Sequence, residues 1–245
     1  MTRGEMIFEV SRSLGLDDTA GSDELILMQR WLNRGIVDVL EKTHCYLDIG
    51  TMQLQSGVTD YRVDSSILAM DDVTVPDLLG TPRELDVVNM IDLLPYLGTV
   101  VVAGDAPWKA AIEGTLMRVA PAPTSAVTLT YFYVPVPTPI TADGTSTLDG
   151  VDPSTATYGG IPTEYHDAIM MYMTWRGSEY NQQGGGFYRG HAFAPGSAFQ
   201  GIYQDRIAAI KKSMKKKAGR GMHAGRVGYP DRQSVPTRND VYPSR

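Results

Sequence analysis

Hydrophobic residues recur at intervals of three and four in several segments, which is the spacing of amphipathic helices. The segment 22–43 has an N-cap candidate in Ser22, and acidic residues follow in its first turn. The segment 161–181 has Pro162 at a suitable first helical position, and its apolar residues occupy more than one side. Further helices are predicted over 199–217 and over 5–14, the latter ended by Gly15. These helices are distant in sequence, and we expect them to pack as one small bundle.

Between residues 48 and 136 the pattern changes to the alternation of apolar and polar positions that is typical of strands. Strands are predicted around residues 52–54, 61–63, 67–68, 73–75, 109–112, 116–119 and 127–134. The turn residues Ser56 and Gly57 predict that the first two strands form a hairpin. A short helix is expected over 88–97, ended by Pro95 and Gly98. The middle of the chain is therefore predicted to be an antiparallel β-sandwich or a small barrel.

The predicted fold class is α+β: a helical bundle from N- and C-terminal helices, with an inserted antiparallel β-sandwich or barrel domain and an extended C-terminal tail. We divide the chain into N-terminal bundle helices (1–47), a β-rich domain (48–137), an exposed loop (138–160), C-terminal bundle helices (161–218) and an extended basic tail (219–245). The loop is too long and polar for a tight connection. The tail is rich in glycine and proline and cannot build a core alone.

Composition places the chain among ordinary globular proteins, with 42% apolar and 20% charged residues in 245. The single cysteine, Cys45, excludes an internal disulfide and a multi-cysteine zinc site. No apolar run approaches the roughly 20 residues that span a bilayer, and the N-terminus lacks a secretory pattern. We therefore expect a soluble protein that is not exported by a classical signal.

Charge is unevenly distributed along the chain. From Tyr203 onward, 11 Lys and Arg stand against 3 acidic residues, a net charge of +8, whereas the first 202 residues carry −14. Lysines at a helix C-terminus offset the negative end of the helix dipole without any ligand. Five lysines in seven positions exceed that need, so contact with an acidic protein or with phosphate is the alternative. They are Lys211, Lys212, Lys215, Lys216 and Lys217.

No catalytic or cofactor motif stands out. The GxxxxGK phosphate loop and the GxSxG nucleophile elbow are both absent from the sequence. The glycines at 219 and 221, with the alanine at 224, follow a helix instead of a strand, which argues against a dinucleotide site. His44 and Cys45 are adjacent and do not face one another in regular structure, so a helix terminus explains them better than a catalytic pair. We expect no cofactor and no enzymatic activity.

Two further groups invite a metal-site interpretation. His166 and Asp167 lie at the start of a predicted helix, but no second ligand follows at a metal-binding spacing. Asp143, Asp149 and Asp152 lie in a loop that contains glycine, but the spacing lacks the EF-hand pattern. An interface histidine and a solvated loop are the simpler interpretations, and we expect no metal.

The order of the elements and four short segments resemble the head-to-tail adaptor proteins of tailed bacteriophages. This connector or head-completion class includes the tail-tubular adaptors of short-tailed phages. The segments are LMQRWLNRGIVDVL (27–40), LMRVAPAP (116–123), LTYFYVP (129–135) and IPTEYHDAI (161–169). The resemblance covers residues 22–218.

The resemblance implies a structural virion neck protein, assembled in the host cytoplasm, that joins the capsid portal to the tail. Copies would form a ring of twelve around a channel for DNA ejection, with no sequence-specific DNA binding and no membrane. The implied partners are the portal protein, a tail or nozzle protein and other copies of the chain. An acidic wall would repel the phosphates of the passing DNA.

Partner-binding residues follow from the resemblance and from the flexible composition of the tail and loops. Portal binding is expected of the basic C-terminal segment: Lys211, Lys212, Lys215, Lys216, Lys217, Arg220, Arg226, Tyr229, Arg232, Arg238 and Tyr242. Aromatic residues in the glycine-rich loop are expected to contact neighbouring subunits or a tail component: Phe187, Tyr188 and Phe193.

Two other functions stay open from the sequence. A virion-associated cell-wall hydrolase would need a cleft with paired acid and base groups, and the carboxylates form no distinctive constellation. A nucleic-acid-binding protein could use the lysine-rich helix. The acidic body and the lack of aromatic residues between the lysines argue against that function.

Overall fold

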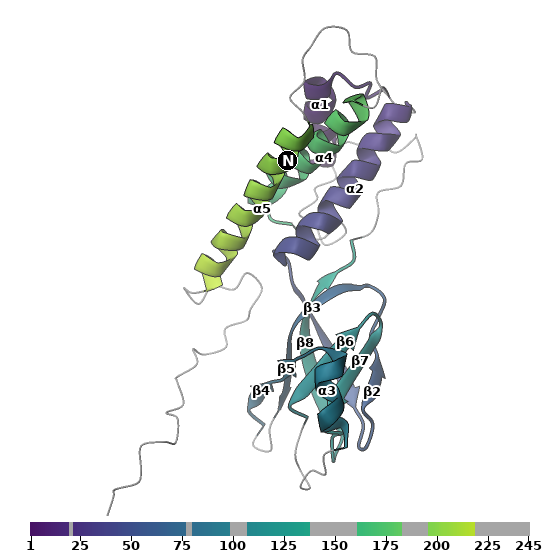
Figure 1. Cartoon of the computed structure of the whole chain (residues 1–245), viewed down its shortest axis with the longest axis vertical. Helices are drawn as coiled ribbons and strands as arrows, with labels where there is room; N and C mark the ends of the chain where they lie inside the picture. Colours follow the sequence, from purple (N-terminus) through teal and green to yellow (C-terminus); the bar gives the residue numbers. More distant parts are fainter. Residues whose placement is uncertain (20–21, 77–79, 99–106, 138–160, 183–195, 219–245) are drawn as a thin grey trace, which may run out of the picture.

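The computed structural model describes residues 1–19, 22–76, 80–98, 107–137, 161–182 and 196–218. A helical bundle and a β domain lie end to end (Figure 1). The helices α1 and α2 precede the β domain in the sequence, and α4 and α5 follow it, so the β domain is inserted into the bundle. The bundle elements are α1 (Arg3–Leu14), α2 (Asp23–Thr43), a 3-10 turn (Thr163–Tyr165), α4 (His166–Gln182) and α5 (Gly196–Ala218).

Local sequence signals set the ends of the first two helices. α1 begins at a capping box between Thr2 and Glu5 and ends at Gly15, whose φ of 65° is the left-handed conformation of a helix C-cap. The Leu25 N–H donates to the Ser22 hydroxyl at 3.1 Å, which confirms the predicted N-cap of α2. Both helices therefore begin and end close to where the sequence predicts.

α4 is the central helix of the bundle, because α1, α2 and α5 all pack against it. Close approach depends on two glycines. A Cβ atom at Gly35 of α2 would lie 3.1 Å from the Tyr172 ring, and one at Gly177 of α4 would overlap the Leu14 side chain. The prediction of a helix buried on more than one side is confirmed by its buried residues: Ala168, Ile169, Tyr172, Met173, Thr174 and Ser178.

The described part of the β domain forms two four-stranded sheets, arranged as a sandwich and not as a closed barrel. The first sheet has the order β1 (Asp48–Leu54), β8 (Val127–Pro135), β3 (Ile67–Pro76) and β4 (Pro82–Glu84). The second has the order β2 (Asp60–Arg62), β7 (Leu116–Ala120), β6 (Lys109–Glu113) and β5 (Asp86–Val87). The core between them includes Leu54, Val73, Val75, Met117, Val119 and Leu129. The predicted α+β class with an inserted sandwich is confirmed, and the predicted tail lies outside the described residues.

The predicted hairpin of the first two strands is wrong. The turn at Gly57 carries the chain from one sheet to the other, so β1 pairs with β8 and β2 pairs with β7. The Tyr61 hydroxyl supports this crossing, because it donates to the Val58 carbonyl at 2.9 Å and accepts from the Gln55 N–H at 2.9 Å. Alternation of apolar residues identifies the strands but does not determine their partners.

Three further details differ from the prediction. Pro95 lies inside α3 (Met90–Leu97) and does not end it, since a proline in so short a helix removes only one backbone hydrogen bond. The strands β4 and β5 were not predicted, because they contain only three and two residues. β5 pairs with β6 in parallel, so the sandwich is not wholly antiparallel.

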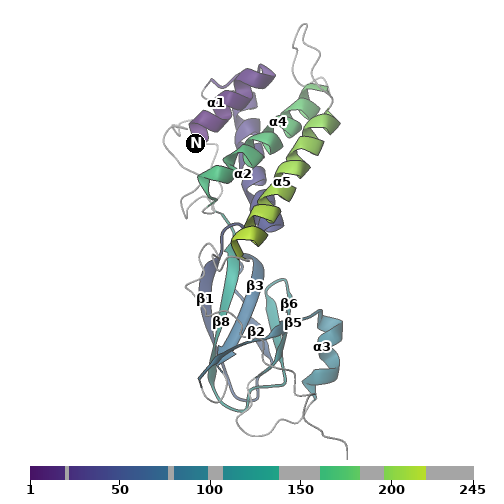
Figure 2. The same cartoon turned by 90° about the vertical axis from the view of Figure 1, so that its left-hand side faces the viewer.

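The two cores meet where the β domain joins the bundle. Val134 near the end of β8 is fully buried within the bundle core, and Leu68 and Ala69 of β3 pack against the same cluster. The first and last strands of the insertion are paired, with Asp48 opposite Tyr133. Figure 2 shows the ends of β1, β8 and β3 directly below the bundle. The inserted domain is therefore held by a packed junction.

Replacement of Gly50 by alanine tests the packing within the sandwich. A Cβ atom there would overlap the Tyr131 ring, which lies across the Gly50 backbone. We expect Gly50→Ala to lower the free energy of unfolding by about 1–3 kcal/mol. The matched change Gly201→Ala in α5 meets no atom within 4 Å and should stabilise the helix by up to about 1 kcal/mol. Thermal unfolding followed by circular dichroism compares the two, and equal midpoints would contradict the packing of Tyr131.

Candidate interaction surfaces

The predicted partner-binding lysines lie on the outer side of α5, near its C-terminal end. Lys211, Lys212, Lys215 and Lys216 are exposed and share one side of the helix, whereas the side that includes Ile207 and Ile210 faces the bundle core. We call these four lysines the basic surface. The Lys217 side chain, residues 219–245 and the aromatic residues of the 183–195 segment lie outside the described part. Their predicted contacts stay predictions.

His44 and Cys45, which the sequence offered as a possible catalytic pair, lie where α2 ends. His44 is the C-cap of α2, and its Nδ1 lies 3.6 Å from Asp71 Oδ1 of β3. The hydrogen bond to Asp71 raises the pKa of His44, while partial burial and the nearby Lys211 act in the opposite direction. Cys45 is buried in the bundle core, and this burial raises the pKa of its thiol. His44 and Cys45 therefore form a helix terminus and show no geometry of a catalytic pair.

His166 and Asp167 also point to different partners. His166 is fully buried, and its Nε2 lies 3.1 Å from the Ile161 carbonyl oxygen. Asp167 lies 3.3 Å from Arg206 of α5. Within the described ranges, no three His, Cys, Asp or Glu side chains gather where a metal ion could bind. The acidic loop residues at 143, 149 and 152 lie outside those ranges.

A polar and aromatic cluster joins α2, α4 and α5 on one side of the bundle. The Tyr203 hydroxyl donates to the Asp38 carboxylate, which also lies 2.7 Å from Lys42 Nζ. The Tyr203 ring packs against Tyr172 and stacks on Trp175, with centroids 5.4 and 6.0 Å apart. Burial and then the bond to Asp38 raise the pKa of Tyr203, so its hydroxyl stays protonated. Sequence patterns could not reveal this cluster, because Asp38 and Tyr203 are 165 positions apart.

A groove of about 300 Å³ lies beside this cluster. Its carboxylates are Asp38 and Glu41, both from α2, and Asp38 already binds Tyr203 and Lys42. In a glycosidase, the acid and the base lie on opposite sides of the bond that is cleaved. Asp38 and Glu41 lie on the same side of one helix and do not have this arrangement. The groove is lined by Asn33, Arg34, Val37, Asp38, Glu41 and Tyr172.

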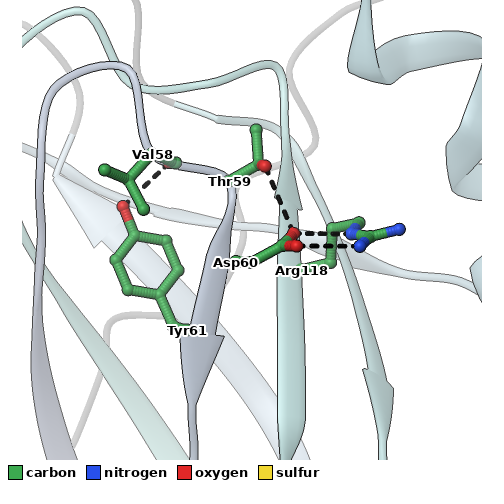
Figure 3. A network of polar contacts seen from close by, with 5 residues as sticks. All are labelled: Val58, Thr59, Asp60, Tyr61 and Arg118. Carbon is green, nitrogen blue, oxygen red and sulfur yellow. Dashed lines mark hydrogen bonds and ion pairs between the residues drawn. The ribbon is translucent and has the colours of Figure 1, made fainter.

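Polar contacts fix the edge of the β domain where β1 and β2 lie (Figure 3). Arg118 of β7 donates to both Asp60 oxygens, at 2.6 and 2.8 Å, and the Thr59 hydroxyl lies 3.2 Å from the same carboxylate. The bonds from Arg118 hold the pKa of Asp60 below its ordinary value. The Tyr61 hydroxyl closes the neighbouring turn through Val58. This edge is therefore well ordered although it is exposed.

Comparison with known proteins points to one family. The model of the family described as SU10 adaptor protein matches residues 1–228. A solved structure described as the neck of an empty GTA particle, computed with C6 symmetry, is 12% identical over 77% of this chain and 82% of its own, with a TM-score of 0.21. A likeness at that TM-score carries no argument about the fold. A search of curated proteins finds no match. No described helix is both long and apolar enough to cross a membrane.

The contact between His44 and Asp71 predicts a pH dependence. The raised pKa of His44 in the folded state means that its protonated form stabilises the fold. This stabilisation is complete below the ordinary value near 6.5 and is lost as the pH rises through the higher, folded value. We expect Asp71→Asn to lower the pKa of His44 in an NMR titration. The variant should also no longer lose stability as the pH rises through the pKa that His44 has in the natural fold. Asp92→Asn is the control, and an equal His44 pKa in both variants would contradict the contact.

Proposed function

Because this chain belongs to the SU10 adaptor protein family, we propose that it is a structural neck protein that joins the capsid portal to the tail of a virion. The observation that carries the proposal is the family match over residues 1–228, which includes the bundle and the whole β domain. The family confirms the resemblance to head-to-tail adaptors that the sequence indicated. In this role the protein acts by binding, and it catalyses no reaction.

The architecture supports an adaptor that contacts different partners at different places. The bundle and the β domain lie end to end and have separate hydrophobic cores. The packed junction at Val134 holds the β domain in a fixed orientation relative to the bundle. Partners bound at the two ends would therefore be held at a defined distance.

Portal docking is the role that we propose for the basic surface and for the tail that follows it. The four exposed lysines lie near the C-terminal end of α5, just before the basic tail of residues 219–245. A segment that cannot fold alone can become ordered when it binds along a partner. The aromatic residues of the 183–195 segment are proposed to meet a neighbouring subunit or a tail component.

A ring of twelve copies around a DNA channel completes the proposal. The first 202 residues carry a net charge of −14, and a lumen lined by such a body would repel the phosphates of the passing DNA. The carboxylates of Asp38, Asp60, Asp167 and Glu179 are held in ion pairs. These contacts favour the adaptor over a cell-wall hydrolase, which needs a free pair of acid and base groups. We place the protein in the virion neck after assembly in the host cytoplasm.

Removal of the tail tests portal docking. We expect the full chain to form rings on purified portal assemblies, whereas a chain truncated after Ala218 should fail to dock. The physical reason is that the truncated chain lacks the five arginines that follow Ala218 but keeps the whole folded bundle. Electron microscopy and light scattering with and without portal provide the measurement. Rings of the truncated chain on the portal would contradict a docking role for the tail, and the absence of rings with either chain would contradict the adaptor function.

Charge removal on the basic surface is a second test of docking. We expect Lys211→Gln, Lys212→Gln, Lys215→Gln and Lys216→Gln, combined in one variant, to weaken portal binding about tenfold or more at low salt. The interaction depends on charge and is screened by salt, so the variant and the natural chain should converge at high salt. The variant Arg12→Gln/Arg30→Gln, which changes two exposed cations elsewhere in the bundle, is the control. If portal binding depends equally on salt in the natural chain, the lysine variant and the arginine control, the basic surface is excluded from docking.

A further inference from the structure

One side of α5 faces away from the bundle and carries small and charged side chains. Tyr203, Ile207 and Ile210 are buried on the opposite side of the helix, which packs on α4. On the outer side, a Cβ atom at Gly201 would meet no atom within 4 Å. Small side chains let a second helix approach closely, because the distance between packed helices depends on the side chains at the contact. We call four exposed residues the outer α5 face: Asp205, Ala208, Ala209 and Lys212.

The outer side of α2 forms a second exposed line in the same bundle. Arg34, Val37 and Glu41 recur at spacings of three and four, so they share one side of the helix. All three line the groove of about 300 Å³. Arg34 and Glu41 are exposed, and Val37 is half-buried between them. We call Arg34, Val37 and Glu41 the α2 groove face.

The charged side chains of these two faces are available to a partner. Their neighbours are not, because Asp38 is paired with Lys42, and Arg206 is paired with Asp167. The exposed charges of the two faces that have no ion-pair partner among the described residues are Arg34, Glu41, Asp205 and Lys212.

The two faces carry opposite charges at the same spacing. Arg34 precedes Glu41 by seven residues, and Asp205 precedes Lys212 by seven residues. Seven residues span about 10.5 Å along a helix. If the two helices lie side by side in the same direction, a base meets an acid at both ends of the contact. The reverse direction would bring like charges together at both ends, so the order of the charges selects a parallel contact.

The helices α2 and α5 have this relative direction within one copy. Tyr203 near the start of α5 bonds to Asp38, whereas Lys211 further along α5 lies near His44 at the end of α2. Neighbouring copies in a ring of twelve differ by a rotation of about 30°, one twelfth of a full turn. The α5 helix of one copy therefore stays nearly parallel to the α2 helix of the next.

The outer α5 face and the α2 groove face cannot meet within one copy. Figure 1 shows α5 and α2 on opposite sides of α4, and the two helices touch only through their inner sides, where Tyr203 bonds to Asp38. Their outer sides point away from each other. Two different surfaces on opposite sides of one molecule can meet head to tail between copies, and such heterologous contacts generate rings when the rotation closes.

We propose that the outer α5 face of one copy packs in parallel against the α2 groove face of the next copy, and that this contact joins neighbouring subunits of the ring. Asp205 then pairs with Arg34 of the next copy. Lys212 pairs with Glu41 one and a half to two turns further along. Lys212 is also part of the basic surface, so the variants below leave every lysine intact. The inference rests on the proposed function, because it assigns the subunit contact of that ring.

Cysteine cross-linking in the full chain, with portal assemblies present, tests the contact. The proposed pairing places Ala208 opposite Val37, so a short bismaleimide should turn the Val37→Cys/Ala208→Cys variant into a ladder of dimers, trimers and larger species. Each single variant should stay monomeric, since the natural Cys45 is buried. A mixture of the two single variants should give dimers and nothing larger, because each copy then carries one reactive face. Dimers of Val37→Cys alone would show that α2 pairs with α2 and would overturn the proposal.

A control variant moves one cysteine to α1. Ser13 is exposed on that helix and lies outside both faces. The Ser13→Cys/Ala208→Cys variant should therefore give no ladder under the same conditions. A ladder equal to that of the Val37→Cys/Ala208→Cys variant would show that α5 meets other surfaces as readily as α2, and it would overturn the assigned contact.

Charge reversal in the Val37→Cys/Ala208→Cys chain tests the ion pairs. We expect Asp205→Arg to lower the cross-linking yield about fivefold or more, because it places two cations together. Adding Arg34→Asp should restore the yield, since the pair forms again with its charges exchanged. Glu9→Arg, which makes the same change in net charge at an exposed position of α1, should leave the yield unchanged. Failure of Arg34→Asp to restore the yield would overturn the proposed pairing.

Electron microscopy of the same samples on portal assemblies separates this inference from the proposed function. Rings on the portal without cross-links between positions 37 and 208 would overturn the contact and leave the adaptor function intact. A ladder without docking would support the contact and contradict the portal role. The absence of both rings and cross-links would overturn the two proposals together.

Discussion

The burial of α4 is the constraint on which the rest of the structure depends. This helix is apolar on several sides, so it becomes stable only when α1, α2 and α5 cover it together. Two of its partners precede the β domain in the sequence, and the chain must therefore leave the bundle and return to the same place. The pairing of β1 with β8 satisfies this requirement, because it holds the first and last strands of the insertion side by side below the bundle.

The surfaces available for partners are those that the two cores do not use. In α5 the inner residues Tyr203, Ile207 and Ile210 are buried, and the lysines that follow occupy the outer side. In α3 the fully buried Leu93 packs against Ala111 and Ala120, and Met90, Tyr96 and Leu97 pack against the same cluster, whereas Ile91 and Leu94 are exposed. Each helix thus has one side that stabilises the fold and another that is free to bind.

The helices could be predicted from sequence because their signals are local: Ser22 caps α2, Gly15 ends α1, and the apolar spacing gives the buried sides. Strand partners could not be predicted, since β1 and β2 follow one another but are bonded to β8 and β7. The bond between Tyr203 and Asp38 is non-local for the same reason. Of the candidate site, charge alone indicated the exposed lysines, whereas the exposure of Ile91 depends on which side of α3 packs against the second sheet.

Weak contacts in each subunit are sufficient for a ring that docks as a unit. An exposed lysine contributes about 0–1 kcal/mol to a surface ion pair, and a disordered tail loses conformational entropy when it binds. In a ring, the first docked subunit holds the others near their sites, so each later contact forms at a high effective concentration. In the proposed role, strong binding to the portal therefore depends on subunits that are joined to one another, because each subunit alone contributes only weak contacts.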